Sequence, residues 1–270
     1  MILREQRSEK VAEILGDIWE ENYIENRPLI EKMEGKGVKS GYMGTPALVV
    51  GAGPSLEKNI DDIASFGNYT IIACDKCCAR LNEEGICPQY VVALNAEKTD
   101  VRKWLEPVNE KKVTLVAPCG VHPDTFVDWV GEIIFINAFT PTGLHDRIYS
   151  EIGIGPMSIG SNAGTFAYTL AYMNSYNPIA YIGMDFSFLR RSDIMDVQDT
   201  TQYNIVEMTD INNEVRYLTL GWFDMAQAFQ ERVDIANSFN IETYNCTEGG
   251  INYSQYVRVK TLKEFNEMIG

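Results

Sequence analysis

The chain has 270 residues, 45% of them apolar, and a formal net charge of −15 at pH 7. This length suits one large α/β domain with appendages, and the apolar share is enough for a sizeable buried core. The negative charge argues against general binding of nucleic acid, because the phosphates of nucleic acid require many lysines and arginines. A phosphate ligand must then be held locally, by backbone N–H groups and helix N-termini. The alternative is that the acidic surface only keeps the protein soluble.

The sequence also predicts the cellular compartment. No stretch approaches the ~18 apolar residues of a membrane span, and the charged start MILREQRSEK lacks the apolar centre of a signal peptide. We therefore expect a cytoplasmic protein with no membrane partner. The six cysteines fit this compartment because they lie in apolar segments. The run CDKCC at 74–78 has no second paired motif, so we predict structural thiols and no metal site.

The first 44 residues predict a helical segment that precedes the main domain. Apolar residues recur there at helical spacing, at Val11, Ile14, Leu15, Ile18 and Trp19. One or two helices are expected, followed by a glycine-rich loop within EGKGVKSGYMGTP. The main domain is placed at 45–270.

From residue 47 onward, short apolar runs alternate with helix-like segments. The predicted strands are 47–50, 70–74, 90–94, 113–117, 132–136, 179–182 and 241–244, and the predicted helices are 56–65, 76–84, 101–105, 123–130 and 162–175. Residues 190–221 break this pattern and predict a hairpin, lid or subdomain inserted over the site. Helices at 223–236 and at the C-terminus follow. The alternation predicts a three-layer Rossmann-like α/β domain with a mostly parallel sheet, preceded by the N-terminal helices.

The stretch ALVVGAGPSLEKNI places a glycine turn between a strand and a helix. Gly51 would allow the tight turn, and Gly53 would let the backbone approach a phosphate. Pro54 and Ser55 suit the start of the helix. The third glycine of the dinucleotide fingerprint is absent, and Asp75 is the acidic residue at the end of the second strand. A phosphate site and a plain strand–helix turn both remain open.

Two further clusters carry candidate ligands. In MSIGSNAGTFAYTLAYM, small and polar residues precede a helix, which suits either a ligand against the backbone or a capped helix packed closely on the sheet; they are Gly160, Ser161, Asn162, Gly164 and Thr165. In PIAYIGMDFSF, Asp185 follows a buried strand, and Asn95 follows the third strand in the same way. Either side chain would hold a sugar hydroxyl, a base amine or Mg²⁺, or would cap the next turn. A structural role is expected for His122 and His145.

Five ordered motifs resemble one family: VVGAGPSLEKNI, NEEGICPQYVVALNAE, IGSNAGTFAYTLAY, PIAYIGMDFSF and YNCTEGGI. They are similar to the central domain of the flagellar motility accessory factors (Maf), which is classed with the archaeal 6-hydroxymethylpterin diphosphokinases as MptE-like. The similarity spans roughly 45–270. A fainter one, through GAGPSL and IGMDF, reaches bacterial sialyltransferases that use CMP-activated sugars.

The resemblance implies a nucleotide or nucleotide-sugar ligand and three functions. The first is a glycosyltransferase that uses a CMP-type nonulosonic sugar, with Glu248, Asp185 or a loop residue in place of the base histidine that the sialyltransferases carry. The second is a pyrophosphokinase that requires Mg²⁺, although Asn95 stands where that branch has a metal-binding aspartate. The third is a nucleotide-binding module without catalysis. No cofactor is certain, and the acceptor and the oligomeric state stay open.

Overall fold

The computed structural model describes residues 2–33, 41–65, 68–197, 205–210, 212–252 and 254–270. Its centre is a nine-stranded sheet with the order β11-β10-β7-β1-β2-β3-β4-β5-β6, in which every neighbouring pair is parallel. The strands are β1 (Ala47–Val50), β2 (Thr70–Cys74), β3 (Tyr90–Val92), β4 (Thr114–Pro118), β5 (Ile133–Ala138), β6 (Pro156–Met157), β7 (Ile179–Ile182), β10 (Thr243–Asn245) and β11 (Val257–Val259).

The sheet changes direction beside β1. From β1 the chain runs through β2, β3, β4 and β5 toward one edge, and β7 then pairs with the other side of β1. The last residue of β1, Val50, is level with Ala73 of β2 and with Ile182 of β7. The chain that leaves β1 therefore continues toward one edge of the sheet, and the chain that leaves β7 continues toward the other. In open parallel sheets, such a switch point is where ligands bind.

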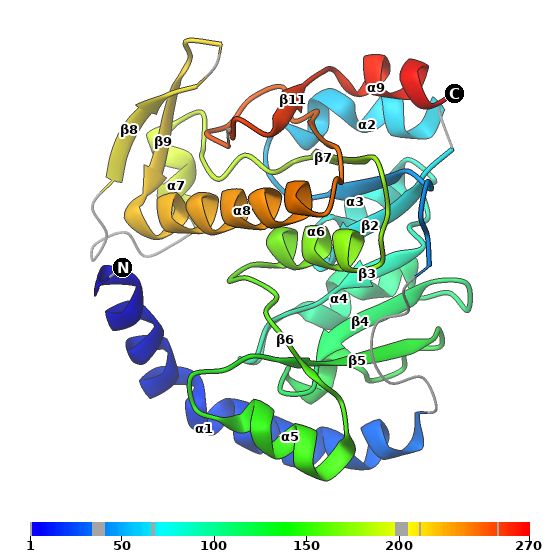
Figure 1. Ribbon diagram of the computed structural model, residues 1–270, viewed down its shortest axis with the longest axis vertical. Helices are drawn as coiled ribbons and strands as arrows, with labels where there is room; N and C mark the ends of the chain where they lie inside the picture. Colours follow the sequence, from blue (N-terminus) through cyan, green and yellow to red (C-terminus); the bar gives the residue numbers. More distant parts are fainter. Residues whose placement is uncertain (1, 34–40, 66–67, 198–204, 211, 253) are drawn as a thin grey trace.

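Helices cover both faces of the sheet, as Figure 1 shows. They are α2 (Leu56–Ser65), α3 (Cys78–Glu83), α4 (Val101–Leu105), α5 (Leu144–Ile152), α6 (Ala163–Met173), α8 (Leu220–Ser238) and α9 (Leu262–Ile269). Strand β4 is buried on both sides, because Val116 packs in the same core as α6 whereas Leu115 and Ala117 pack in the core of α1 and α5. This double burial explains the continuous apolar runs of the strands.

The predicted fold class is confirmed, and several elements have the predicted bounds: β1, β2, β7, α2 and α4. Helix α5 and the short strands β6 and β11 were not predicted. The predicted helix 123–130 is wrong beyond one 3₁₀ turn, Pro123–Thr125. Residues 190–221 contain α7 (Arg191–Val197) and an antiparallel hairpin of β8 (Ile205–Thr209) and β9 (Val215–Thr219), although 198–204 and 211 lie outside the described residues.

The N-terminal segment is one helix, α1 (Ile2–Lys32), which lies beside α5. Two buried asparagines attach it to the sheet. Asn22 donates from Nδ2 to the carbonyls of Ala96 and Gly120, and Asn26 donates from Nδ2 to the carbonyls of Cys119 and Val121. The helix therefore satisfies backbone groups of the loops after β3 and β4. In the described part of the chain, neither α1 nor any other helix is long and apolar enough to span a bilayer.

We predict that Asn26→Ala lowers the free energy of unfolding by about 2–4 kcal/mol, because it leaves two buried carbonyls without a donor. Urea denaturation measures the change. Glu25→Ala, at an exposed position one residue earlier, is the matched control and should stay within about 0.5 kcal/mol of the parent. Equal losses in both variants would show that the asparagine does not attach α1 to the sheet.

Candidate functional site

At the switch point the loops after β1 and β7 touch through glycines. The N–H of Gly51 donates to the carbonyl of Ile182 over 2.9 Å, and the N–H of Gly53 donates to the carbonyl of Gly183 over 2.8 Å. A Cβ at Gly51 would lie 2.4 Å from the Gly183 oxygen. Gly183 itself has a φ of +62°, in the left-handed region. The glycines are therefore required for the close approach of two backbone segments.

This contact changes the account of the predicted phosphate turn. We expected the N–H groups of Gly53 and Ser55 to hold a phosphate. In the structure, however, Gly53 donates to Gly183, and the N–H of Ser55 donates to Oδ2 of Asp185 over 3.2 Å. Pro54 has no N–H to offer. A Cβ at Gly53 would lie 2.1 Å from Asp185 Oδ2, so the space beside this glycine is filled by the protein itself. Nucleotide binding by Gly53, Pro54 and Ser55 stays a prediction. A nucleotide bound here would have its phosphate contacted by groups other than the N–H groups of Gly53 and Ser55.

Asp185 follows β7 as predicted and is only 1% exposed. Its Oδ2 accepts hydrogen bonds from the hydroxyl of Ser55, at 2.7 Å, and from the Ser55 N–H. Its Oδ1 has no hydrogen-bond partner among the described residues. Burial raises the pKa of this carboxyl, while the Ser55 hydrogen bonds and the nearby cations Arg216 and Lys58 act in the opposite direction. Asp185 thus fixes the start of α2 and keeps one oxygen for another partner.

The loop after β10 folds over Asp185. The N–H of Ile251 donates to the Asp185 carbonyl at 3.0 Å, and a Cβ at Gly250 would lie 2.6 Å from the same backbone. Glu248, the other predicted catalytic residue, has a φ of +55° and is partly exposed. Its Oε1 accepts from Asn59 Nδ2 at 2.8 Å, and its carbonyl accepts from Lys58 Nζ at 2.9 Å. The structure therefore brings Glu248, Asp185 and the β1 turn together around the first turns of α2.

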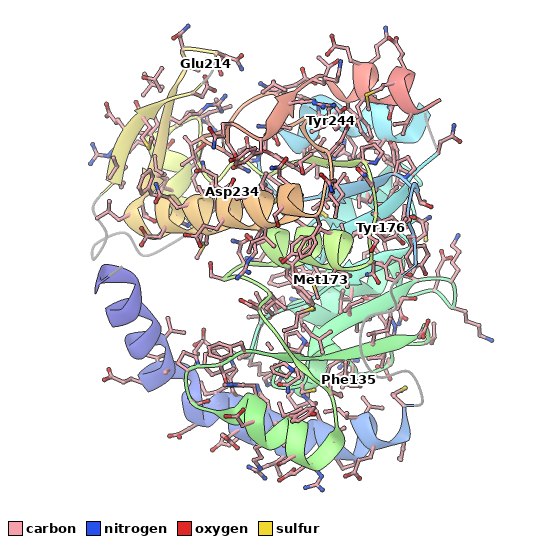
Figure 2. All side chains as sticks on the ribbon, viewed as in Figure 1. Phe135, Met173, Tyr176, Glu214, Asp234 and Tyr244 are labelled. Atoms are coloured by element: carbon pink, nitrogen blue, oxygen red, sulfur yellow. The ribbon has the colours of Figure 1, made fainter. Side chains whose placement is uncertain are left out.

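Arg216 is a residue of this region that the sequence analysis missed. It lies on β9 and is 1% exposed, and its guanidinium pairs with Asp210 and with Glu214, which lies near the tip of the hairpin in Figure 2. A Cβ at Gly249 would be 2.7 Å from Arg216 Nη2. The inserted hairpin thereby brings a cation to the loop that covers Asp185. Arg216 and Leu218 are buried on one face of β9, but an arginine in an alternating strand normally faces solvent, so the sequence carried no signal for its burial.

Asp75 is a second buried carboxylate, at the end of β2. It is 3% exposed, its Oδ1 accepts from the N–H of Lys76 at 2.8 Å, and its Oδ2 has no hydrogen-bond partner among the described residues. Burial raises the pKa of Asp75 from 3.8 to about 6, partly opposed by the Lys76 N–H and the Lys76 charge. A carboxyl with this pKa is ionised at neutral pH and remains basic enough to accept a proton.

The small-residue cluster before α6 forms a capped helix start. Asn162 is the N-cap: its Oδ1 accepts from the Thr165 N–H, and its Nδ2 donates to Thr165 Oγ1, both at 2.9 Å. A Cβ at Gly160 would lie 2.3 Å from the Thr165 methyl group, and one at Gly164 would lie 2.4 Å from the Met184 sulfur. Ser161 is exposed. The geometry matches the alternative of a capped helix packed closely on the sheet, in which Asn162 and Thr165 satisfy each other.

Asn95 follows β3, which β1 and β2 separate from β7 and Asp185. Its carbonyl accepts from the His122 N–H at 3.0 Å, in the region where α1 attaches to the loops after β3 and β4. His122 Nδ1 accepts from the Asp124 N–H and so caps a 3₁₀ turn, and His145 packs against Phe139. Both histidines have the structural roles that were predicted.

The donor set does not fit a preformed magnesium site. Within the described residues, no three of the His, Cys, Asp and Glu side chains gather closely enough to hold a metal ion. The six cysteines are free thiols, and Cys74, Cys77 and Cys78 are buried. Asp75 and Asp185 project from strands that β1 separates, and neighbouring strands lie about 4.8 Å apart. We therefore derive no step through a metal ion.

We predict that Gly53→Ala lowers the free energy of unfolding by about 2 kcal/mol or more, because its Cβ would overlap Asp185 and the Gly183 carbonyl. The matched control is Gly155→Ala, where an added Cβ meets no atom within 4 Å. This control should be neutral or slightly stabilising. Urea denaturation of both variants tests the close crossing, and a Gly53→Ala protein as stable as the parent would refute it.

We also predict that Asp75 makes stability depend on pH. Because the pKa of the Asp75 carboxyl is higher in the folded protein, the folded protein binds more protons than the unfolded chain between about pH 4 and 6. The stability of the protein therefore falls as the pH rises through this window. The shift from 3.8 to about 6 corresponds to roughly 3 kcal/mol at 1.36 kcal/mol per pKa unit. Asp75→Asn should gain about this amount above pH 6 and nothing below pH 4. Denaturation curves of both proteins at several pH values test this, and parallel pH profiles would contradict it.

Comparisons with known proteins place this geometry in a family. Residues 21–191 match the family model described as 6-hydroxymethylpterin diphosphokinase MptE-like. No curated protein matches the chain. Among solved structures, the chain is similar to a Maf glycosyltransferase from Magnetospirillum magneticum AMB-1, with a TM-score of 0.67 and 18% identity. The similarity covers 92% of this chain and 41% of that one, so the chain spans about two fifths of its length. Because the family model covers more than half of the sequence, the chain belongs to the 6-hydroxymethylpterin diphosphokinase MptE-like family.

Proposed function

We propose that the chain is a glycosyltransferase that takes a nonulosonic sugar from a CMP-type donor. The observation that carries the proposal is the charge at the switch point. In a protein of net charge −15, Lys58 and Arg216 both act on Asp185 beside the β1 turn. Departure of a nucleotide leaves negative charge on its phosphate, and fixed cations stabilise charge that develops in the transition state.

The size of the leaving group favours a nucleoside monophosphate. CMP leaves with one phosphate, which carries less charge than a diphosphate and suits a site with one available cation, Lys58, at the start of α2. Lys58 is exposed and bonds only to a carbonyl in the described contacts, so its ammonium is able to turn toward a ligand. Arg216 is buried and paired with Asp210 and Glu214, so its charge is neutralised within the hairpin and Lys58 is the cation left for a ligand.

Pyrophosphoryl transfer, which the family description names, is the second candidate. That reaction normally uses Mg²⁺ to neutralise charge on the transferred phosphates. Mg²⁺ in such sites is held by one or two carboxylates together with the substrate phosphates. Asn95 stands where the kinase branch has a metal-binding aspartate, and the loss of that carboxylate favours the transferase over the kinase.

The likeness to the Maf enzyme supports the same choice at the level of fold. The two chains share a fold, and this chain spans about two fifths of the longer one. The acceptor stays unassigned. Cytoplasmic location, where activated nucleotide sugars are made, is part of the proposal.

We predict that CMP or CDP raises the melting temperature without added metal. A ligand at a hundredfold excess over its Kd stabilises the folded state by about 2.7 kcal/mol. For a chain of this length the shift is about 5 °C. ATP, with and without Mg²⁺, is the comparison. A magnesium-dependent response to ATP without a response to cytidine nucleotides would contradict the transferase and favour the kinase. No change in melting temperature with any nucleotide would contradict both the transferase and the kinase.

A further inference from the structure

The buried carboxylate of Asp75 keeps one oxygen without a hydrogen-bond partner among the described residues, and it lies at the end of β2, the strand next to β1. We propose that Asp75 is the general base of the proposed glycosyl transfer, accepting the proton of the acceptor hydroxyl on Oδ2. This inference rests on the proposed function and assigns the base to neither Asp185 nor Glu248.

The first argument is position. The pairing of β1 with β2 ends at Val50 and Ala73, and Asp75 lies two residues past this last pair, on the strand next to the one that leads into the β1 turn. Ala52 and Pro54 form the exposed side of this turn. A donor phosphate beside the turn carries its anomeric carbon one bond away, and a reacting hydroxyl must approach that carbon to about 3–3.5 Å. The end of β2 is therefore next to the reacting atoms.

The second argument is that Asp75 has an oxygen to spare. Oδ1 accepts from the N–H of Lys76, whereas Oδ2 is buried and has no partner among the described residues. A buried carboxylate oxygen without a hydrogen-bond partner destabilises the fold. Its presence in a folded protein therefore calls for a functional explanation. A hydroxyl of the acceptor would satisfy this oxygen and place its proton for transfer.

The third argument comes from the two other carboxylates of the site. Asp185 Oδ2 accepts two hydrogen bonds from Ser55, and the cations Arg216 and Lys58 favour its ionised form. Glu248 Oε1 accepts from Asn59. These hydrogen bonds join Asp185 and Glu248 to α2, whereas Asp75 bonds only to the N–H of the next residue in the described contacts.

The surroundings of Asp75 leave it as the group that titrates near neutral pH. Lys76 is the neighbouring cation, and it lies over the ring of Trp104. The adjoining thiols of Cys74, Cys77 and Cys78 have pKa values raised by burial and stay neutral. Helix α4, which packs on this turn, carries Arg102 and Lys103, paired with Asp128 and Asp100.

The chemical step balances with the groups named. The acceptor oxygen forms a bond to the anomeric carbon of the donor, and its proton passes to Asp75 Oδ2. The bond between the anomeric carbon and the phosphate oxygen breaks, and its electron pair leaves with CMP. When water takes the place of the acceptor, the same step hydrolyses the donor, so the base is testable without knowledge of the acceptor.

The experiment measures hydrolysis of CMP-N-acetylneuraminate and, separately, the Kd of CMP. For Asp75→Asn we expect kcat to fall about 100-fold or more, as removal of a general base does, with the Kd of CMP unchanged. The acid limb of the wild-type pH profile should disappear in this variant. Formate should restore part of the turnover of Asp75→Ala. Glu97→Gln, an exposed acid at the same edge of the sheet, is the matched control and should keep the wild-type rate.

Three results would overturn the inference. Asp75→Asn with wild-type kcat would exclude Asp75 as the base. A raised Kd for CMP with unchanged kcat would assign Asp75 to nucleotide binding instead. A wild-type protein that neither binds CMP nor hydrolyses the donor would refute the proposed function itself, and the base with it.

Discussion

The close approach of Gly51 and Gly183 is the contact on which the rest of the site depends. Two backbone segments meet where a Cβ on either residue would overlap the other's carbonyl at 2.3–2.4 Å. This approach aligns the ends of β1 and β7 and lets Gly53 donate to Gly183. It also sets Asp185 under the start of α2, where Ser55 donates two hydrogen bonds to it. Without these glycines, neither the turn nor the carboxylate would be held in place.

The two buried carboxylates illustrate how surroundings divide similar groups into different roles. For Asp185 the Ser55 hydrogen bonds and two nearby cations only partly offset the cost of burial, and its pKa is raised. Asp75 gains one backbone N–H and the charge of Lys76, and burial raises its pKa to about 6. Both carboxylates keep one oxygen without a partner among the described residues. Asp185 holds the start of α2 through Ser55, whereas Asp75 bonds only to the next residue in the described contacts, and a buried group with a shifted pKa of this kind is typical of functional positions.

Sequence patterns predicted the strands well because parallel strands buried on both faces require continuous apolar runs. They failed for α5, whose polar first turn obscures the spacing of Leu144, Ile148 and Ile152. They also identified the Gly51–Gly53 turn as a place of close backbone approach, but they did not reveal what approaches. The partner is Gly183, 132 residues later in the chain, and such a long-range contact leaves no local pattern. For the same reason, the position of Arg216 beside Gly249 could not be predicted from the sequence.

The extent of the family match bears on how the chemistry is assigned. The match ends at residue 191, so it includes the β1 turn, Asp75 and Asp185 but not Arg216, Glu248 or the loop that covers Asp185. The matched part thus supplies the switch-point turn and two buried carboxylates. Arg216 on β9 and the loop after β10, which lies over Asp185, come from outside the match. Family membership therefore establishes the scaffold, whereas a reaction must be argued from the individual residues of the site.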